Sequence, residues 1–195
     1  MKKTLQLLLL LLITAYGQAQ TGDTLIRIKQ LGWSLRLPRT FVLVSDKENQ
    51  ELTDKGKNVI EKSTDVQVDM TGLVTLLSAS QGEFNYISAT IQAFNPEEDG
   101  DYMEVNEGVK AMLYKTFTDQ MPGGKVDTSS SRQVIDGIEF ARFNADISAD
   151  NKKIMTMVML YKLYKGYDFG ITYVYVDDKA RAAIESMLAG SKFEK

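Results

Sequence analysis

The acidic segment 95–101 is where residue types and spacing come nearest to a metal site. Oxygen-bearing side chains stand at alternate positions, Asn95, Glu97 and Asp99, and a glycine occupies the sixth position. Calcium loops share this spacing, but they place a bidentate glutamate at the twelfth position. That position is Asn106 here. We therefore expect a solvated loop that caps the following helix, with calcium binding as the alternative.

Five tyrosines gather near the C-terminus on two neighbouring predicted strands, interleaved with Lys162 and Lys165: Tyr161, Tyr164, Tyr167, Tyr173 and Tyr175. Exposed aromatic rings of this kind stack on bases or sugars. Pairing of aromatic side chains across strands, beneath a covering helix, is the commoner role of tyrosine in sheets. We expect such packing here. A tyrosine-lined pocket for a carbohydrate or a small apolar ligand stays as the alternative.

The chain contains no histidine and no cysteine. It therefore lacks Ser–His and Cys–His couples, thiolate nucleophiles and the commonest ligands of transition metals. Paired carboxylates can catalyse hydrolysis without histidine, but with 26 acidic residues no spacing singles out a pair. We predict no catalytic, cofactor-binding or metal-ligating residues and no cofactor.

Three shorter motifs also have ordinary structural explanations. The serines at 129–131 lack a nucleophile elbow, and the Gly-Gly-Lys run at 123–125 lacks the spacing of a phosphate-binding loop. We expect both to form turns. Met155, Met157 and Met159 share one face of a strand. Thioethers bind Cu(I), but methionines in a buried strand usually fill the core, which we expect here.

The first 19 residues resemble a secretory signal peptide. Lys2 and Lys3 precede an apolar run over 5–13, and Gly-Gln-Ala at 17–19 resembles a cleavage site. The run is shorter than the ~20 residues that span a bilayer. We expect removal of 1–19, a single domain over 20–195 without a membrane span, and a periplasmic or secreted location. A lipoprotein carries its acyl chains on a cysteine just after the cleavage point. The sequence has no cysteine, so we expect no lipid anchor of this lipoprotein type.

The acidic charge of the chain bears on its partners. Loss of Lys2 and Lys3 leaves 21 basic residues against 26 acidic ones, a formal charge of −5. Nucleic acids and anionic membrane surfaces bind clustered Lys and Arg. We therefore exclude nucleic acid as a partner and expect another protein of the cell envelope.

Hydrophobic periodicity predicts a mixed fold of strands and helices. Most predicted strands are joined as hairpins, most clearly around Asp136-Gly137, so the sheet is expected to be antiparallel. We predict an α+β sandwich with a single antiparallel sheet covered by about three helices. Its strands fall at 33–37, 41–44, 73–80, 84–94, 126–135, 138–147, 154–164 and 169–176, and its helices at 45–62, 102–117 and 177–189.

This order of elements, with particular residues in it, resembles the PsbP-like fold. The matching features are a first strand ending in Leu-Pro at 35–38, a helix before the first hairpin, the run Val-Ile-Asp-Gly-Ile-Glu-Phe-Ala-Arg-Phe at 134–143, and a closing strand, helix and Phe193 over 173–193. The fold is shared by photosystem extrinsic proteins, a nuclear Ran-binding factor and bacterial envelope proteins. The resemblance implies a scaffold without a shared active site, whose members mostly bind other proteins.

The sequence thus favours an exported, non-catalytic protein that binds another envelope component as an accessory module. The first alternative is a small-ligand carrier with an apolar or tyrosine-lined pocket between a helix and the sheet. The second is a carboxylate-dependent hydrolase, which requires two acids in one cleft with one of them desolvated.

Overall fold

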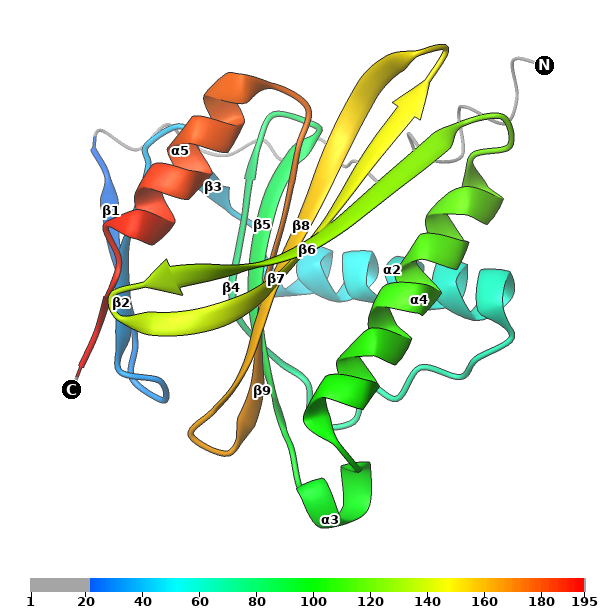
Figure 1. Cartoon of the computed structure of the whole chain (residues 1–195). Coiled ribbons are helices and arrows are strands. Elements are labelled where there is room, and N and C mark those ends of the chain that lie inside the picture. Colours follow the sequence, from blue (N-terminus) through cyan, green and yellow to red (C-terminus); the bar gives the residue numbers. More distant parts are fainter. Residues whose placement is uncertain (1–21, 195) are drawn as a thin grey trace.

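The computed structural model describes residues 22–194, so the predicted signal peptide lies outside the described residues. Every strand pair in this range is antiparallel, and helices cover the sheet (Figure 1). The predicted α+β class is confirmed. Within residues 22–194, no helix has both the length and the apolar character that a bilayer span requires.

The main sheet has seven strands in the order β3-β4-β5-β9-β8-β7-β6. At the β6–β7 turn, Asp136 and Gly137 have φ angles of 47° and 82°, as a two-residue hairpin turn requires. The predicted hairpin is confirmed. The serines at 129–131 lie inside β6, so their assignment to a turn was wrong. The strands are β3 (Val42–Leu43), β4 (Val74–Gln81), β5 (Asn85–Ala93), β6 (Lys125–Ile135), β7 (Ile138–Ala149), β8 (Lys152–Tyr164) and β9 (Tyr167–Tyr175).

The first predicted strand belongs to a separate sheet rather than to the main one. β2 (Trp33–Leu37) pairs with β1 (Thr24–Ile28) on one edge and with β10 (Lys192–Phe193) on the other. Trp33 packs against Phe169 of β9 at 5.5 Å between ring centroids. The expectation of one sheet therefore changes to two. The alternate apolar residues of β2, Trp33, Leu35 and Leu37, are buried in the core next to the main sheet. The two edges of β2 are hydrogen-bonded to β1 and to β10 near the C-terminus.

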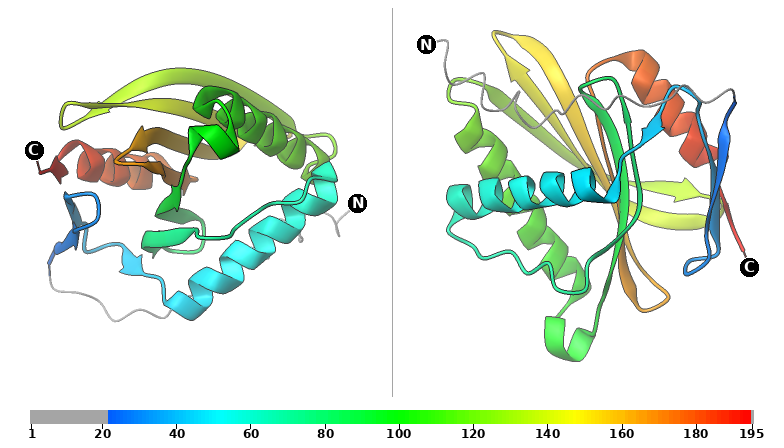
Figure 2. Two further views of the ribbon diagram at one scale, coloured as in Figure 1. Left: turned by 90° about the horizontal axis from the view of Figure 1, so that it is seen from below. Right: turned by 180° about the vertical axis from the view of Figure 1, so that it is seen from behind.

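The larger core lies between the main sheet, the three-stranded sheet and α5 (Asp178–Ala189). Ile87, Leu160 and Ile171 point into it from three neighbouring strands, and Ile184 meets them from α5. Figure 2 shows α5 and the three-stranded sheet on one side of the main sheet. Because successive side chains of a strand point to opposite faces of the sheet, every second side chain of the main sheet faces away from this core.

The opposite face is covered by α2 (Asp46–Thr64) and α4 (Tyr102–Gln120), which contact each other. A smaller core lies beneath α4: Phe143, Ala145, Met157 and Tyr161. No apolar residue of α2 or α4 is fully buried, although Tyr102, Leu113 and Phe117 of α4 pack partly buried against this smaller core. The buried residues are Ser63 in α2 and Asn106, Lys110 and Thr116 in α4. The apolar stripes predicted for both helices are therefore only partly used in packing against the sheet.

Candidate ligand-binding pocket

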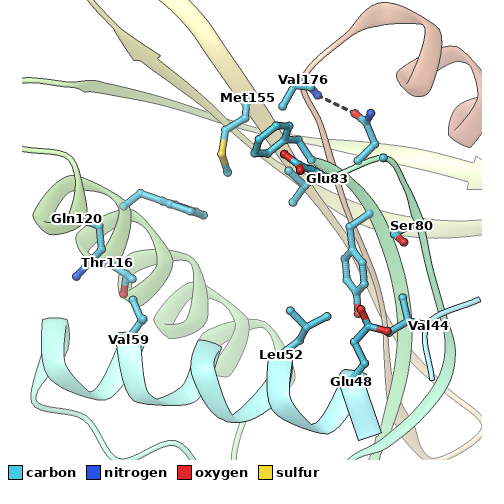
Figure 3. A pocket seen from close by; sticks show the side chains of 16 residues that line it. Val44, Glu48, Leu52, Val59, Ser80, Glu83, Thr116, Gln120, Met155 and Val176 are labelled. Carbon is cyan, nitrogen blue, oxygen red and sulfur yellow. Dashed lines mark hydrogen bonds between the residues drawn. The ribbon is translucent and has the colours of Figure 1, made fainter. Parts of the chain in front are cut away.

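A pocket of about 310 Å³ lies between α2, the C-terminal half of α4 and the ends of the central strands (Figure 3). It is partly open to solvent. Its volume is at the lower end of the range of small-molecule sites, roughly 300–1,000 Å³. Apolar side chains make up most of its walls: Val44, Leu52, Val59, Phe84, Phe117, Met155, Val174 and Val176.

The start of α2 fixes where its pocket-facing residues lie. The Ser45 side chain accepts a hydrogen bond of 3.3 Å from the backbone N–H of Glu48, so the helix is capped at the residue where the sequence places its start. Leu52 and Val59, seven residues apart, lie on one face of the helix. Both point from α2 into the space below Met155 in Figure 3, and both are half-buried. α2 therefore forms an apolar wall of the pocket.

Two polar side chains in the walls, Tyr86 and Thr116, are hydrogen-bonded within the protein. The Tyr86 hydroxyl lies 2.8 Å from Ser78 Oγ and donates to Asn49 Oδ1 at 3.2 Å. Thr116 Oγ1 donates to the backbone carbonyl of Met112 at 2.9 Å. With these groups satisfied, Tyr86 and Thr116 offer mainly carbon surface to a ligand. The arrangement suits an apolar molecule.

Two carboxylates also line the pocket, Glu48 from α2 and Glu83 from the β4–β5 turn. Glu83 is exposed and Glu48 is half-buried, so water reaches both groups. A general acid in glycoside hydrolysis is typically a desolvated carboxyl with a raised pKa. Neither glutamate is buried as that role requires.

The acid whose pKa is raised by burial lies outside this pocket. Burial raises the pKa of Asp168 on β9, although the hydrogen bond from Tyr102 opposes the shift. Burial, followed by the nearby charge of Asp168, raises the pKa of the Tyr102 phenol well above its usual value. Neither residue lines the pocket. The hydrolase hypothesis therefore gains no support from the acids that line this pocket or from Asp168.

The five tyrosines singled out in the sequence are divided between the two faces of the main sheet. Tyr161 packs in the smaller core below α4, whereas Tyr173 and Tyr175 stack in the larger core, 6.3 Å apart. Core packing of these three rings agrees with the expectation, but pairing across strands does not, because Tyr173 and Tyr175 both belong to β9 and the ring beside Tyr161 is Tyr102 of α4. Tyr175 lines a smaller adjoining pocket. The main pocket is not the tyrosine-lined one of the sequence alternative, because none of the five lines it: Tyr161, Tyr164, Tyr167, Tyr173 and Tyr175. Tyr86 does.

The acidic segment forms one helical turn, α3 (Pro96–Asp99), followed by the cap of α4. Asn95 Oδ1 accepts from the backbone N–H of Glu97 at 3.1 Å, and Asp101 Oδ1 accepts from that of Glu104 at 3.0 Å. The predicted capping role is confirmed. In the part of the chain that the structure describes, no three acidic side chains converge as metal ligands would.

The methionines of β8 have different surroundings although they share one face of the strand. Met157 is buried in the smaller core and Met159 packs against it, as expected of core residues. Met155 instead lines the pocket and points toward α2 in Figure 3. Its role in a binding site was not predicted.

A buried cation holds α4 to the sheet. Lys110 Nζ lies 2.5 Å from Glu107 Oε1 and 3.3 Å from Ser130 Oγ, and 5.9 Å from the ring centroids of Phe143 and Tyr161. Burial alone would lower the pKa of Lys110, but the contacts with Glu107 and Tyr161 raise it overall. Its donors are thus engaged by α4 and the strands beneath, which indicates a structural role.

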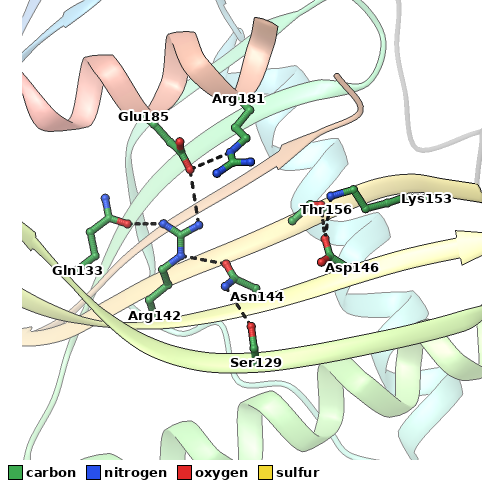
Figure 4. A network of polar contacts seen from close by, with 9 residues as sticks. All are labelled: Ser129, Gln133, Arg142, Asn144, Asp146, Lys153, Thr156, Arg181 and Glu185. Carbon is green, nitrogen blue, oxygen red and sulfur yellow. Dashed lines mark hydrogen bonds and ion pairs between the residues drawn. The ribbon is translucent and has the colours of Figure 1, made fainter. Parts of the chain in front are cut away.

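A second polar network joins α5 to β6 and β7 (Figure 4). The guanidinium of Arg142 donates to Asn144 Oδ1 at 3.0 Å and to Gln133 Oε1 at 2.6 Å. It also lies 3.7 Å from Glu185, which pairs with Arg181 at 3.2 Å. Arg142 is therefore committed to partners within the protein, as expected of a link between elements rather than an anion site.

Sequence reasoning missed the pocket walls contributed by Glu83, Phe84 and Tyr86. They follow Gly82 in a hairpin turn, where solvent exposure is the usual expectation. The aromatic residue Phe84, placed two residues after the turn glycine, is the signal that could have identified this wall.

Comparison with solved structures confirms the predicted PsbP-like fold. The solution structure of cyanobacterial PsbP (CyanoP) from Synechocystis sp. PCC 6803 matches with a TM-score of 0.56 and 9% identity, covering 93% of this chain and 97% of that one. LpqN, described as involved in cell envelope biogenesis of Mycobacterium tuberculosis, matches with a TM-score of 0.42 and 11% identity, covering 87% and 89%. No protein-family model and no curated protein sequence matches this chain.

Proposed function

We propose that this protein is a non-catalytic binding protein of the cell envelope that holds a small apolar molecule in the pocket between α2 and α4. The observation that supports this most is the pocket itself, about 310 Å³ and walled mainly by carbon. The ligand's apolar body would contact Leu52 and Val59 on one side and Met155 on the other. The protein would then act as a carrier or a sensor for that ligand.

The expected affinity is modest. Each buried methylene of a ligand contributes about 0.8 kcal/mol, and the loss of translational and rotational freedom offsets several kcal/mol of the total. A partly open pocket of this volume leaves part of the ligand in water. Reversible binding of this kind suits a protein that takes up a ligand and releases it.

The non-catalytic part of the proposal rests on residue chemistry and on fold. The sequence has no histidine or cysteine, and the pocket acids remain in contact with water. The fold likeness to PsbP supports a binding or accessory role by analogy. An envelope protein that delivers or receives the ligand is the partner we propose.

Placement in the envelope rests on the signal-like residues 1–19. Export would leave residues 20–195 as one domain in the periplasm or outside the cell. Cell fractionation with the full chain and with a chain lacking the basic residues Lys2 and Lys3 tests this. Retention of both chains in the cytoplasm would contradict export while leaving the binding proposal intact.

Binding is tested with N-phenyl-1-naphthylamine, a neutral probe whose fluorescence rises in apolar surroundings. The purified protein should increase this fluorescence saturably. Leu52→Phe/Val59→Phe, which fills the pocket from α2, should weaken probe binding at least about tenfold, a loss of roughly 1.4 kcal/mol. Asn58→Phe, on the exposed side of the same helix, is the matched control.

The thermal melt of each variant shows whether the fold is kept. Probe binding that is absent from the natural protein, or unchanged in the folded double variant, would contradict the proposal. Phe84→Ala offers a second variant. It removes an aromatic ring from the wall opposite α2 and adds no side-chain volume to the pocket.

A further inference from the structure

The charged side chains around the pocket are both acidic. Glu48 reaches it from α2 and Glu83 from the β4–β5 turn, so carboxylates stand on two of its walls (Figure 3). Among residues 22–194, no lysine or arginine lines it. The balance of charge at its edge is therefore negative.

These carboxylates are not neutralised within the protein. The ion pairs of residues 22–194 involve other groups, and neither Glu48 nor Glu83 takes part in one. Glutamates without a partner at the edge of an apolar cavity keep their charge available to a ligand.

The adjoining surface has the same sign. A smaller pocket of about 150 Å³ shares Met155 with the first and is lined by Asp177 and Asp178 together with Lys153. Lys153 already lies 3.4 Å from Asp146. Lys153, the one cation that the described part of the chain contributes to this smaller pocket, is thus paired with Asp146. The acidic surroundings therefore extend beyond the first pocket.

Aromatic rings add a further preference. Phe84, Tyr86 and Phe117 line the cavity, and the faces of aromatic rings attract cations. A carboxylate or sulfonate on a bound ligand would instead lie in the field of Glu48 and Glu83 with no cation lining the pocket to receive it.

We propose that the ligand is a cationic amphiphile, an amine or quaternary ammonium with an apolar body, and that the pocket discriminates against fatty acids and other anions. This inference rests on the proposed function, since it assigns the charge class of the ligand of the same pocket. The apolar body lies between α2 and the strands, and the cationic head lies in the field of the carboxylates of Glu48 and Glu83.

The test displaces bound N-phenyl-1-naphthylamine with decylamine, decanol and decanoate, which share one chain and differ in head group. Decylamine should displace the probe at about tenfold lower concentration than decanoate, since each exposed pair of opposite charges contributes a few-fold and like charges repel. Decanol should fall between them.

Glu48→Gln/Glu83→Gln keeps the shape of the pocket and removes both charges. It should bring decylamine and decanoate to within about twofold of each other, because the charge preference is lost while apolar burial remains. Affinity for the neutral probe should not change. Glu97→Gln/Glu98→Gln removes the same charge from the exposed turn α3 and should leave the preference unaltered.

Decanoate that displaces the probe as well as decylamine does would overturn the charge inference while leaving the apolar pocket standing. Persistence of the amine preference in Glu48→Gln/Glu83→Gln would also overturn it. If calorimetry detects no binding of the probe or of any decyl compound, the proposed function and this inference both fail.

Discussion

The Tyr102 hydroxyl donates a hydrogen bond of 2.7 Å to Asp168 Oδ1, and this bond ties the first turn of α4 to β9. It places a carboxylate in a half-buried position beneath a helix, where burial raises its pKa. α4 also forms one side of the pocket through Thr116 and Phe117. The bond therefore positions a pocket wall, and it makes the stability of that wall depend on pH.

Replacement of Asp168 tests this dependence. The pKa of Asp168 is raised in the folded protein, so the folded state binds its proton more tightly than the unfolded state does. Its contribution to stability is fully present below the unfolded value of 3.8 and is lost as pH rises through the folded pKa. Asp168→Asn keeps an acceptor for Tyr102 and should raise the free energy of unfolding at pH 7.

Urea denaturation at pH 7 and at pH 3.5 gives the comparison, and the gain should be smaller at the lower pH, where Asp168 is largely protonated in both states. A variant that is less stable than the natural protein at pH 7 would show that the ionised carboxylate strengthens the bond more than burial penalises it.

Tyr173 carries a buried hydroxyl without a hydrogen-bond partner in the described residues. Burial raises its pKa to about 12, so its contribution to stability is lost as pH rises above the usual phenol value of 10. Tyr173→Phe should increase the free energy of unfolding at pH 7 by about 1 kcal/mol, since it removes an unsatisfied buried polar group. It should also reduce the loss of stability above pH 10.

Chemical denaturation of Tyr173→Phe and of Tyr175→Phe, side by side from pH 7 to 11, measures both effects. A loss of stability in Tyr173→Phe comparable to that of a broken hydrogen bond would mean that the hydroxyl has a partner after all.

The C-terminal tail should depend on the ring of Phe193. That ring stacks on Trp33 at 5.8 Å with planes 10° apart, and the Phe193 backbone N–H donates to Asp136 at 2.8 Å. Phe193→Ala should lower the free energy of unfolding by about 3 kcal/mol, as truncation of buried aromatics does. Lys192→Ala removes only an exposed ion pair and should change stability by less than about 1 kcal/mol.

Calorimetric melting temperatures of the two variants separate these effects. If the melting temperatures of Phe193→Ala and Lys192→Ala fall by the same small amount, the Trp33–Phe193 stack does not stabilise the three-stranded sheet.

The fourth prediction concerns the capping of α4 by the acidic segment 95–101. Asp101 accepts backbone hydrogen bonds at the start of α4, so Asp101→Ala should cost about 1 kcal/mol of stability. Millimolar calcium should leave the melting temperature of the natural protein unchanged. A calcium-dependent rise that Asp99→Asn abolishes would show instead that the segment binds the ion.

Local patterns were sufficient for most of the fold. The positive φ angles demanded by Asp136-Gly137 and the cap at Ser45 are set by neighbouring residues, so the hairpin and the start of α2 could be predicted. β1 could not be predicted in the same way, because a short strand carrying Arg27 is stabilised by its pairing with β2, a tertiary contact.

The pocket could be anticipated only as a class of site. Periodicity identified apolar stripes on both helices but not the space left between them, which depends on how α2 and α4 meet the sheet. The tyrosine cluster suggested the wrong wall because strand alternation divides it between two faces. Glu83 from a turn and Met155 from a distant strand both line the pocket. Their spacing along the chain does not indicate that they share this site.

The most direct test of the central claim is methyl NMR of the protein during titration with N-phenyl-1-naphthylamine. Binding in the pocket predicts saturable shifts of the methyl signals of Leu52, Val59 and Met155. The methyl signals of Leu35 and Ile184 in the larger core should not shift. Shifts centred on Leu35 and Ile184, or no saturable shift at the pocket methyls, would contradict the account.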